Sequence, residues 1–183
     1  MKVLGIDPGA RVTGYGVVEG QSARLRHVAH GALRPRAAAL AARLAEIQRG
    51  LAQVIAEHGP DIAVVERVFV GRSARSALVL GQARGAALAA AAAAGVTVEE
   101  LSATQIKRAV SRSGAADKAQ VQRMVTRLLA LPAAPPRDAA DALAAAICRA
   151  LAPPLPQSPR RRAALRPRPL RVRAVRLAPE RGL

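Results

Sequence analysis

The sequence has very few of the residues that many small folds depend on. It contains one cysteine, one tyrosine, one phenylalanine and no tryptophan among 183 residues. A single cysteine, Cys148, excludes a disulfide framework and any zinc site built from cysteines, and it suits a reducing cytoplasm. Because Tyr15 and Phe69 are the only aromatic residues, a core must be built from Ala, Val, Leu and Ile. A hydrophobic fraction of 51% excludes wholesale disorder and predicts a folded domain.

Long apolar segments are also absent. The longest run without a charged residue, 85–98, has 14 residues, whereas a membrane-spanning helix needs about 18 or more. The amino terminus does not lead from positive charge into an apolar stretch, so we expect no signal peptide. These absences predict a soluble cytoplasmic protein with no membrane partner.

Acidic residues are scarce and unevenly distributed. Lys and Arg number 29 against 12 Asp and Glu, a net charge of +17. Residues 1–150 carry 20 basic and 11 acidic residues, and 151–183 carry nine Arg, many prolines and only Glu180. We therefore predict one domain over 1–150 and a disordered basic tail over 151–183, since such a segment cannot offset its ordering entropy. The charge favours a nucleic-acid partner, although a basic surface that merely reflects an Arg- and Ala-biased composition is the alternative.

Hydrophobic periodicity predicts an α/β fold. Apolar runs predict strands over 2–7, 12–19, 25–33, 61–66 and 96–100. Helical spacing and capping signals predict helices over 37–58, 73–94, 102–110, 117–132 and 136–150. Three strands, a helix, a strand, a helix, a strand and then helices indicate a mixed five-stranded sheet with helices on both faces.

Four acids stand where a metal site would require them. Asp7 and Glu66 end two apolar strands, and if these strands are parallel neighbours both carboxylates emerge at one sheet edge. Asp138 and Asp141 lie three residues apart on the last helix and share a face. Four converging carboxylates would repel one another without a cation, and hard divalent ions such as Mg²⁺ prefer oxygen ligands. Paired metals can activate a water and stabilise the leaving oxygen of a phosphodiester.

Simpler roles exist for two of these acids. Asp7 could cap the turn at Pro8-Gly9, and Asp138 in a first helical turn suits the helix dipole without any metal. Glu66 and Asp141 lack such an explanation, because one ends an apolar strand and the other lies in an Ala-rich helix.

Several motifs resemble the RuvC family of bacterial Holliday junction resolvases. They occur in order over about residues 1–150: Ile6-Asp7-Pro8-Gly9, Thr13-Gly14-Tyr15-Gly16, Glu66-Arg67-Val68-Phe69, Gly81-Gln82-Ala83-Arg84-Gly85, Lys107, Asp117-Lys118-Ala119-Gln120-Val121 and Asp138-Ala139-Ala140-Asp141. Some relatives have His near the last two acids, where this chain has Asp. The tail after Ala150 has no counterpart in the resemblance.

The resemblance implies a ribonuclease-H-like fold and a homodimer that nicks two like-polarity strands of four-way junction DNA together with the RuvA–RuvB complex. It implies that Asp7, Glu66, Asp138 and Asp141 are the catalytic, metal-binding acids. We expect two Mg²⁺ ions per subunit, with Mn²⁺ able to substitute.

The candidate DNA-binding residues are Phe69, Arg72, Lys107 and Lys118. Lys118 opposes the dipole at the start of a helix, an unfavourable place that points to function. Phe69, three residues after Glu66, could stack on an unpaired base, or it could pack in the core. Gly81 and Gly85 would allow close approach of a second subunit, or of the chain's own sheet.

Three other functions fit parts of the sequence. An actin-like ATPase or sugar kinase also opens with an Asp-Gly loop, but 183 residues without a duplicated motif disfavour it. A non-catalytic nucleic-acid-binding protein would use the acids only to balance charge. A RuvX-type nuclease shares the opening loop, whereas Glu66-Arg67-Val68-Phe69 and the segment around Lys118 favour the RuvC type.

Overall fold

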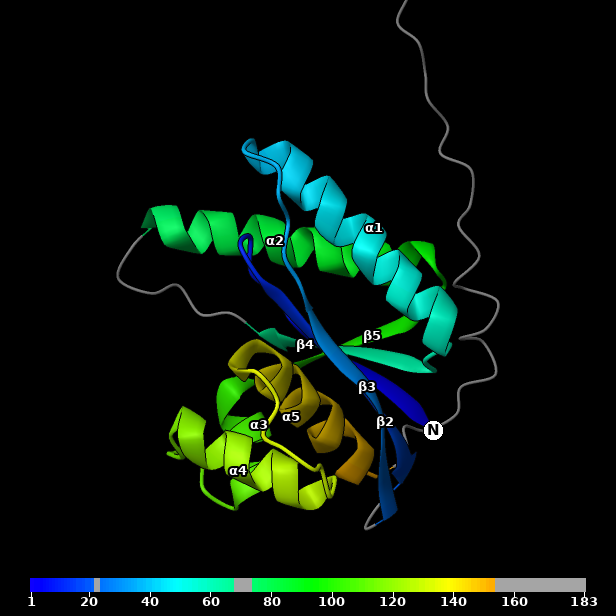
Figure 1. The fold of residues 1–183 in the computed structure, drawn as a ribbon, viewed down its shortest axis with the longest axis vertical. Helices are drawn as coiled ribbons and strands as arrows, with labels where there is room; N and C mark the ends of the chain where they lie inside the picture. The colour runs from blue at the N-terminus through cyan, green and yellow to red at the C-terminus, as the bar shows by residue number, and fades with distance from the viewer. Residues whose placement is uncertain (22–23, 68–73, 154–183) are drawn as a thin grey trace, which may run out of the picture.

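The apolar runs of the sequence form the strands of one mixed sheet. The computed structural model describes residues 1–21, 24–67 and 74–153. The strands are β1 (Lys2–Asp7), β2 (Thr13–Gln21), β3 (Arg24–Leu33), β4 (Ile62–Arg67) and β5 (Thr97–Ser102). The helices are α1 (Leu40–His58), α2 (Ala74–Ala93), α3 (Ala103–Ser111), α4 (Lys118–Leu128) and α5 (Arg137–Leu151). Every predicted element is present in the predicted order (Figure 1).

The strand order is β3-β2-β1-β4-β5. β1 pairs antiparallel with β2 and parallel with β4, which pairs parallel with β5. This confirms the predicted mixed sheet. Because Ile6 is registered with Val65, Asp7 and Glu66 follow at the same edge.

Helices cover both faces of the sheet, so the core has two parts. One face packs against α1 and α2, where Ile47, Leu51 and four alanines of α2 (Ala83, Ala87, Ala90 and Ala91) are completely or nearly completely buried (Figure 1). The other packs against α3, α4 and α5 through Ile106, Val121 and Ile147. The side chains are aliphatic or Ala, as the lack of aromatic residues requires.

Glycines in β1 and β2 let α5 lie directly on the sheet. A Cβ atom added to Gly5 would come within 1.9 Å of the Ala142 carbonyl oxygen, and one added to Gly14 within 2.0 Å of the Asp138 carbonyl oxygen. These contacts involve helix backbone, which cannot move aside as a flexible side chain can. The glycines therefore fix the height of α5, and of its acids, above the sheet.

Local signals explain some of the helix ends but not the end of α4. Ser102 and Gln105 form the predicted capping box at the start of α3. α4 ends at Leu128, earlier than the predicted 132, because Ala130 takes a left-handed conformation (φ 48°) and the Leu131 N–H donates to the Thr126 carbonyl at 2.9 Å. This is the usual hydrogen bond of a left-handed helix end, formed here with alanine where glycine is common.

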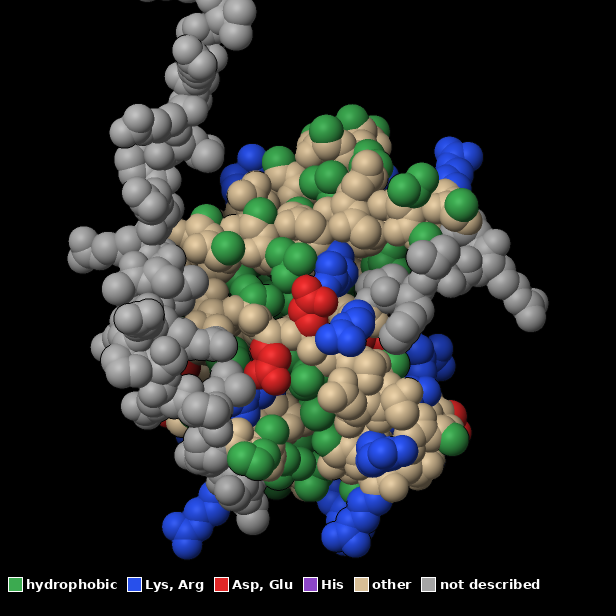
Figure 2. Space-filling model, turned by 180° about the vertical axis from the view of Figure 1, so that it is seen from behind, with side chains coloured by type: hydrophobic (Ala, Val, Ile, Leu, Met, Phe, Trp, Pro, Cys, Tyr) green, Lys and Arg blue, Asp and Glu red, His purple; other side chains and the backbone are tan. Residues whose placement is uncertain are grey.

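α2 has an open outer face. By length and composition alone it could cross a membrane, a weak criterion that core helices of soluble proteins also meet, and 22% of its apolar window is buried. Leu78 is 70% exposed, and nothing lies within 4 Å of a Cβ added to Gly81 or Gly85. Seen from behind, the upper layer that holds α1 and α2 shows scattered hydrophobic side chains, basic ones at its margins and no acidic ones (Figure 2).

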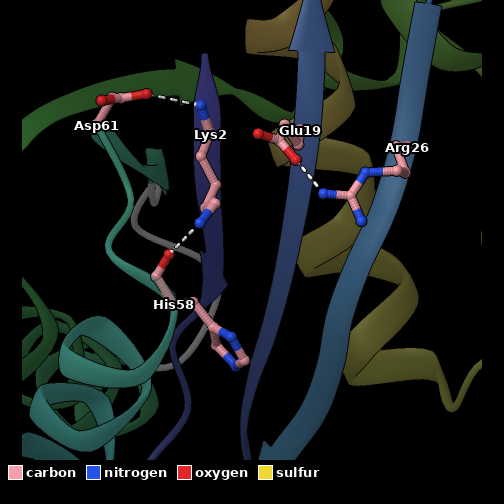
Figure 3. A network of polar contacts seen from close by, with 5 residues as sticks. All are labelled: Lys2, Glu19, Arg26, His58 and Asp61. Atoms are coloured by element: carbon pink, nitrogen blue, oxygen red, sulfur yellow. Dashed lines mark hydrogen bonds and ion pairs between the residues drawn. The ribbon is translucent and has the colours of Figure 1, made fainter.

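Polar contacts fasten the opposite end of the sheet. The Lys2 backbone N–H donates to Asp61 Oδ2 at 2.7 Å, and its Nζ donates to the His58 carbonyl at 2.6 Å (Figure 3). Glu19 and Arg26 form an ion pair across β2 and β3. The two Lys2 contacts join the start of β1 to the end of α1 and to Asp61, just before β4, at the far end of β1 from Asp7.

Candidate active site

An acidic hollow opens at the carboxyl edge of β1 and β4. Its volume is about 450 Å³. Its charged lining residues come from five elements of the chain, β1, β4, α3, α4 and α5: Asp7, Glu66, Arg67, Lys107, Lys118 and Asp141. The rest of the lining is mainly apolar, with Leu80, Ile106, Val121 and Ala144. A polar centre in an apolar wall is a common form for a ligand or active site.

The strand ends place the first two acids. Asp7 and Glu66 emerge side by side because β1 and β4 are parallel neighbours in register. After Asp7 the chain turns sharply, and the buried Thr13 holds this turn: its hydroxyl donates to the Gly9 carbonyl at 2.8 Å and accepts from the Gly9 N–H at 3.3 Å. Asp7 therefore stands between a strand and a fixed loop.

The two acids of α5 are not equivalent. Asp141 lines the hollow, whereas Asp138, one turn earlier, does not. Asp138 lies in the first turn of α5, where a carboxylate favours the helix dipole, as the simpler sequence interpretation allowed. Its negative charge still raises the pKa of Asp7, but by less than any other group near that carboxylate. The structure thus brings three of the four predicted acids to one hollow and leaves the fourth beside it.

The acids make each other harder to ionise. Burial, together with the nearby Asp141 and Glu66 carboxylates, raises the pKa of Asp7 to about 7, against the opposing effect of Lys118. Burial and Asp141 also raise the pKa of Glu66, while Lys118 and Lys107 oppose the increase. A carboxyl group with a pKa near neutrality lacks a counter-charge, and a bound cation would supply it.

Two lysines flank the acids. Lys118 Nζ donates to Asp141 Oδ2 at 2.9 Å, and this hydrogen bond raises the pKa of the lysine. Asp117, the predicted cap of α4, accepts from the Gln120 N–H at 2.6 Å and so fixes the helix start on which Lys118 stands. Lys107 projects into the same hollow from α3. The two lysines therefore line one space.

The donors of the hollow match a hard divalent cation. All the acidic groups offer oxygen ligands, which Mg²⁺, Mn²⁺ and Ca²⁺ prefer. The ammonium group of Lys118 already pairs with Asp141, which shows that a positive charge is accommodated beside this carboxylate. In the described ranges, no three His, Cys, Asp or Glu side chains are grouped closely enough to hold an ion as they stand. Binding a metal would thus require the carboxylates to draw together and Lys118 to turn outward.

Some predicted residues lie outside the described ranges. Phe69 and Arg72 belong to 68–73, and nearly all of the basic tail lies beyond 153. Other lining residues were missed at the sequence level. One of them is Arg67, directly after Glu66. Two others belong to the apolar wall: Ile106, directly before Lys107, and Val121, three residues after Lys118. Nothing in the sequence pattern marked these three residues as part of a site.

Comparison with known sequences gives consistent matches. Residues 3–149 match the family model of crossover junction endodeoxyribonuclease RuvC. A protein of that name from Shewanella frigidimarina is 52% identical over 146 residues, covering 80% of this chain and 84% of the relative. Another, from Pseudomonas putida, is 52% identical over 148 residues, covering 81% and 85%.

Solved structures agree with the sequence matches. Thermus thermophilus RuvC in complex with a Holliday junction substrate is similar with a TM-score of 0.78 and 34% identity, covering 82% of this chain and 93% of that one. A second T. thermophilus RuvC structure gives a TM-score of 0.74 at 36% identity, covering 82% and 94%. The yeast mitochondrial Holliday junction resolvase Ydc2 shares the fold, with a TM-score of 0.60 at 13% identity, covering 89% and 81%.

Proposed function

Because this chain belongs to the RuvC family of crossover junction endodeoxyribonucleases, we propose that its acidic hollow is the place where junction DNA is cleaved. The chain is a ribonuclease-H-like, metal-dependent endonuclease that resolves Holliday junctions. We assign the catalytic, metal-binding role to Asp7, Glu66 and Asp141, with Asp138 as the outer member. The observation that supports this assignment is that three acids distant in sequence line one hollow of a strongly basic protein.

We propose Mg²⁺ as the metal, with two ions per subunit and Mn²⁺ as a substitute. Asp7 and Glu66 would hold it from the sheet and Asp141 from α5. When bound, divalent metal supplies an activated water and stabilises the leaving oxygen of the phosphodiester. The raised pKa of Asp7 fits this role, because its carboxylate gains most from a nearby positive charge.

The chain's own residues prepare the hollow for a phosphodiester. Lys107 and Lys118 present ammonium groups that attract the DNA backbone and stabilise charge on the phosphate oxygens. The apolar wall of Leu80, Ile106 and Val121 limits water at the acids and so strengthens electrostatic contacts inside. With two such sites in a homodimer, strands of like polarity would be nicked symmetrically.

A cleavage assay on synthetic DNA tests this function. We expect full-length protein with Mg²⁺ to nick a four-way junction, to leave a linear duplex of the same sequence intact, and to do nothing with a chelator. Restoring Mg²⁺ or adding Mn²⁺ should restore nicking. Nicking of junctions in the chelator, or equal nicking of duplex and junction, would contradict the proposal.

Replacing Lys118 tests whether this lysine takes part in catalysis. We expect Lys118→Ala to slow single-turnover junction cleavage by about 100-fold, the usual cost of losing one charged group at a developing charge. Its side chain is 71% exposed, so the thermal midpoint should stay nearly constant. Arg123→Ala, which removes an exposed charge from the same helix, is the matched control. A thermal midpoint that falls together with activity would make Lys118 a structural residue.

We propose that the outer face of α2 forms the homodimer interface. Leu78, Gly81 and Gly85 share this face, because they are three and seven residues apart. An exposed leucine beside two open glycines allows another helix backbone to approach closely. Two-fold symmetry would then place two hollows on two related strands of the junction.

A substitution at Leu78 tests the dimer. In sedimentation at micromolar concentration, we expect the wild type to be a dimer and Leu78→Glu a monomer, because the charge would be buried without a partner. Leu128→Glu, on α4, is the control, since Leu128 is also partly exposed (37%). A dimer that survives Leu78→Glu, or a monomeric wild type, would remove this assignment.

Further proposals come from the family resemblance. We propose that the enzyme acts with the RuvA–RuvB complex in the cytoplasm, and that Phe69 and Arg72 contact the junction near Glu66. Residues 151–183 would form a separate basic tail. Phe69→Ala should weaken junction binding and leave the fold intact.

A further inference from the structure

A second hollow, of about 540 Å³, adjoins the acidic one. It lies between the loop joining β1 to β2 and the first turns of α2. Arg11 comes from the loop and Arg75 from the helix, and Val12, Val79 and Leu80 form the apolar part of its wall. Two guanidinium groups thus share an open space that the cleavage mechanism does not use.

No acidic residue in the described part of the chain pairs with either arginine. Both are exposed, and within the described part of the chain neither forms an ion pair with a carboxylate. Arg84, also on α2, does have one, Glu100, at 2.6 Å. Arg75 moreover stands in a first helical turn that contains no acid, where positive charge is unfavourable. An anion in this hollow would compensate for both charges.

Arg11 is held in place by its loop. Thr13 closes the turn through two hydrogen bonds to Gly9, and Ala10 is buried next to Arg11. The backbone that carries Arg11 is therefore fixed before any ligand binds. Less conformational freedom is lost on binding when a contact is preorganised in this way.

The position of the hollow identifies the kind of anion. Leu80 lines both hollows, and Arg11 is four residues from Asp7. A DNA strand with one phosphate at the acids must continue away from them, and its next phosphates would pass over this space. Guanidinium groups bind phosphate oxygens with paired hydrogen bonds, and the apolar wall suits a sugar.

We propose that Arg11 and Arg75 form a phosphate-binding site for the backbone of the cleaved strand, next to the scissile phosphate. The site positions that strand and takes no part in the chemical step. This inference rests on the proposed function of the acidic hollow. It is compatible with the proposed dimer, because Arg75 lies roughly a quarter turn around α2 from the face of Leu78, Gly81 and Gly85.

Junction binding measured over a salt series tests the proposal. Full-length protein in Ca²⁺, with a fluorescent four-way junction, is compared with Arg11→Ala, Arg75→Ala and the double variant. Each lost phosphate contact should reduce the slope of log K against log salt by about 0.9. We expect about tenfold weaker binding for each single variant at moderate salt. Arg24→Ala, with the same charge change at the other end of the sheet, should keep the wild-type slope.

Neutral methylphosphonates, placed one at a time beside the cut, locate the contact. One position should weaken wild-type binding about tenfold and hardly affect the double variant. Equal loss in both proteins, or variants that behave like Arg24→Ala, would overturn the inference. The wild type would still cleave junctions in that case, so failure of this site is distinct from failure of the acidic hollow. Equal thermal midpoints confirm that the variants are folded.

Discussion

Asp7→Asn is expected to abolish junction cleavage and to leave junction binding intact. Asn keeps the shape of the side chain but loses the charge that would hold a divalent cation. We expect the single-turnover rate to fall by at least about 1,000-fold, which corresponds to about 4 kcal/mol of lost transition-state stabilisation. Cleavage of a labelled four-way junction at saturating enzyme measures the rate, and a gel shift in Ca²⁺ measures binding.

Asp61→Asn is the matched control for this experiment. It removes one negative charge at the other end of the sheet, and the new amide oxygen can still accept the hydrogen bond from the Lys2 N–H. It should cleave at the wild-type rate. If Asp7→Asn also kept that rate, the metal-binding role of the hollow would be wrong, since Asp7 is its most buried acid with a shifted pKa.

Without metal, the protein is expected to lose stability as the pH rises from about 4 to about 7. The folded pKa of Asp7 is about 7, against an ordinary value of 3.8, so the folded state holds a proton in this range that the unfolded state has released. Stability falls with pH wherever the folded state binds more protons. The loss amounts to about 4 kcal/mol for Asp7, and Glu66, whose pKa is also raised, acts in the same direction.

Denaturant unfolding in a chelator at pH 5, 6, 7 and 8 measures this loss. The comparison that matters is wild type against Asp7→Asn, because other titrations, such as that of His27 with its lowered pKa, are common to both. The variant should become the more stable protein towards pH 8. Mg²⁺ at that pH should stabilise the wild type and hardly affect the variant. Parallel pH curves for the two proteins would contradict the raised pKa of Asp7.

Local signals were sufficient for the order of the elements. The apolar run before Asp7, the capping box at Ser102 and the proline pair before α5 each act within a few residues, so the sequence displays them directly. The end of α4 was placed too late because Ala130 adopts a left-handed conformation, which the pattern marks only when glycine is present.

The site could be predicted only as far as the sheet determines it. Parallel pairing of β1 and β4 puts Asp7 and Glu66 together. The sequence indicates this pairing because both strands are apolar runs that end in an acidic residue. The difference between Asp138 and Asp141 depends on how α5 is rotated on the sheet, which no local pattern encodes. The same holds for the hollow of Arg11 and Arg75, since its two halves come from distant segments. The kinase, non-catalytic and RuvX alternatives were separated by family membership.

Gly5 and Gly14 have a consequence for how this enzyme can be inactivated. Neither carries a functional group, yet even one methyl group at either position would collide with the backbone of α5. A variant with alanine at either position would retain every acid and lysine of the site. It would, however, push α5 away from the sheet and so move Asp141 away from Asp7 and Glu66. Substitutions at Gly5 and Gly14 should therefore abolish junction resolution in genetic screens as substitutions of the acids do, although neither glycine takes part in the chemistry.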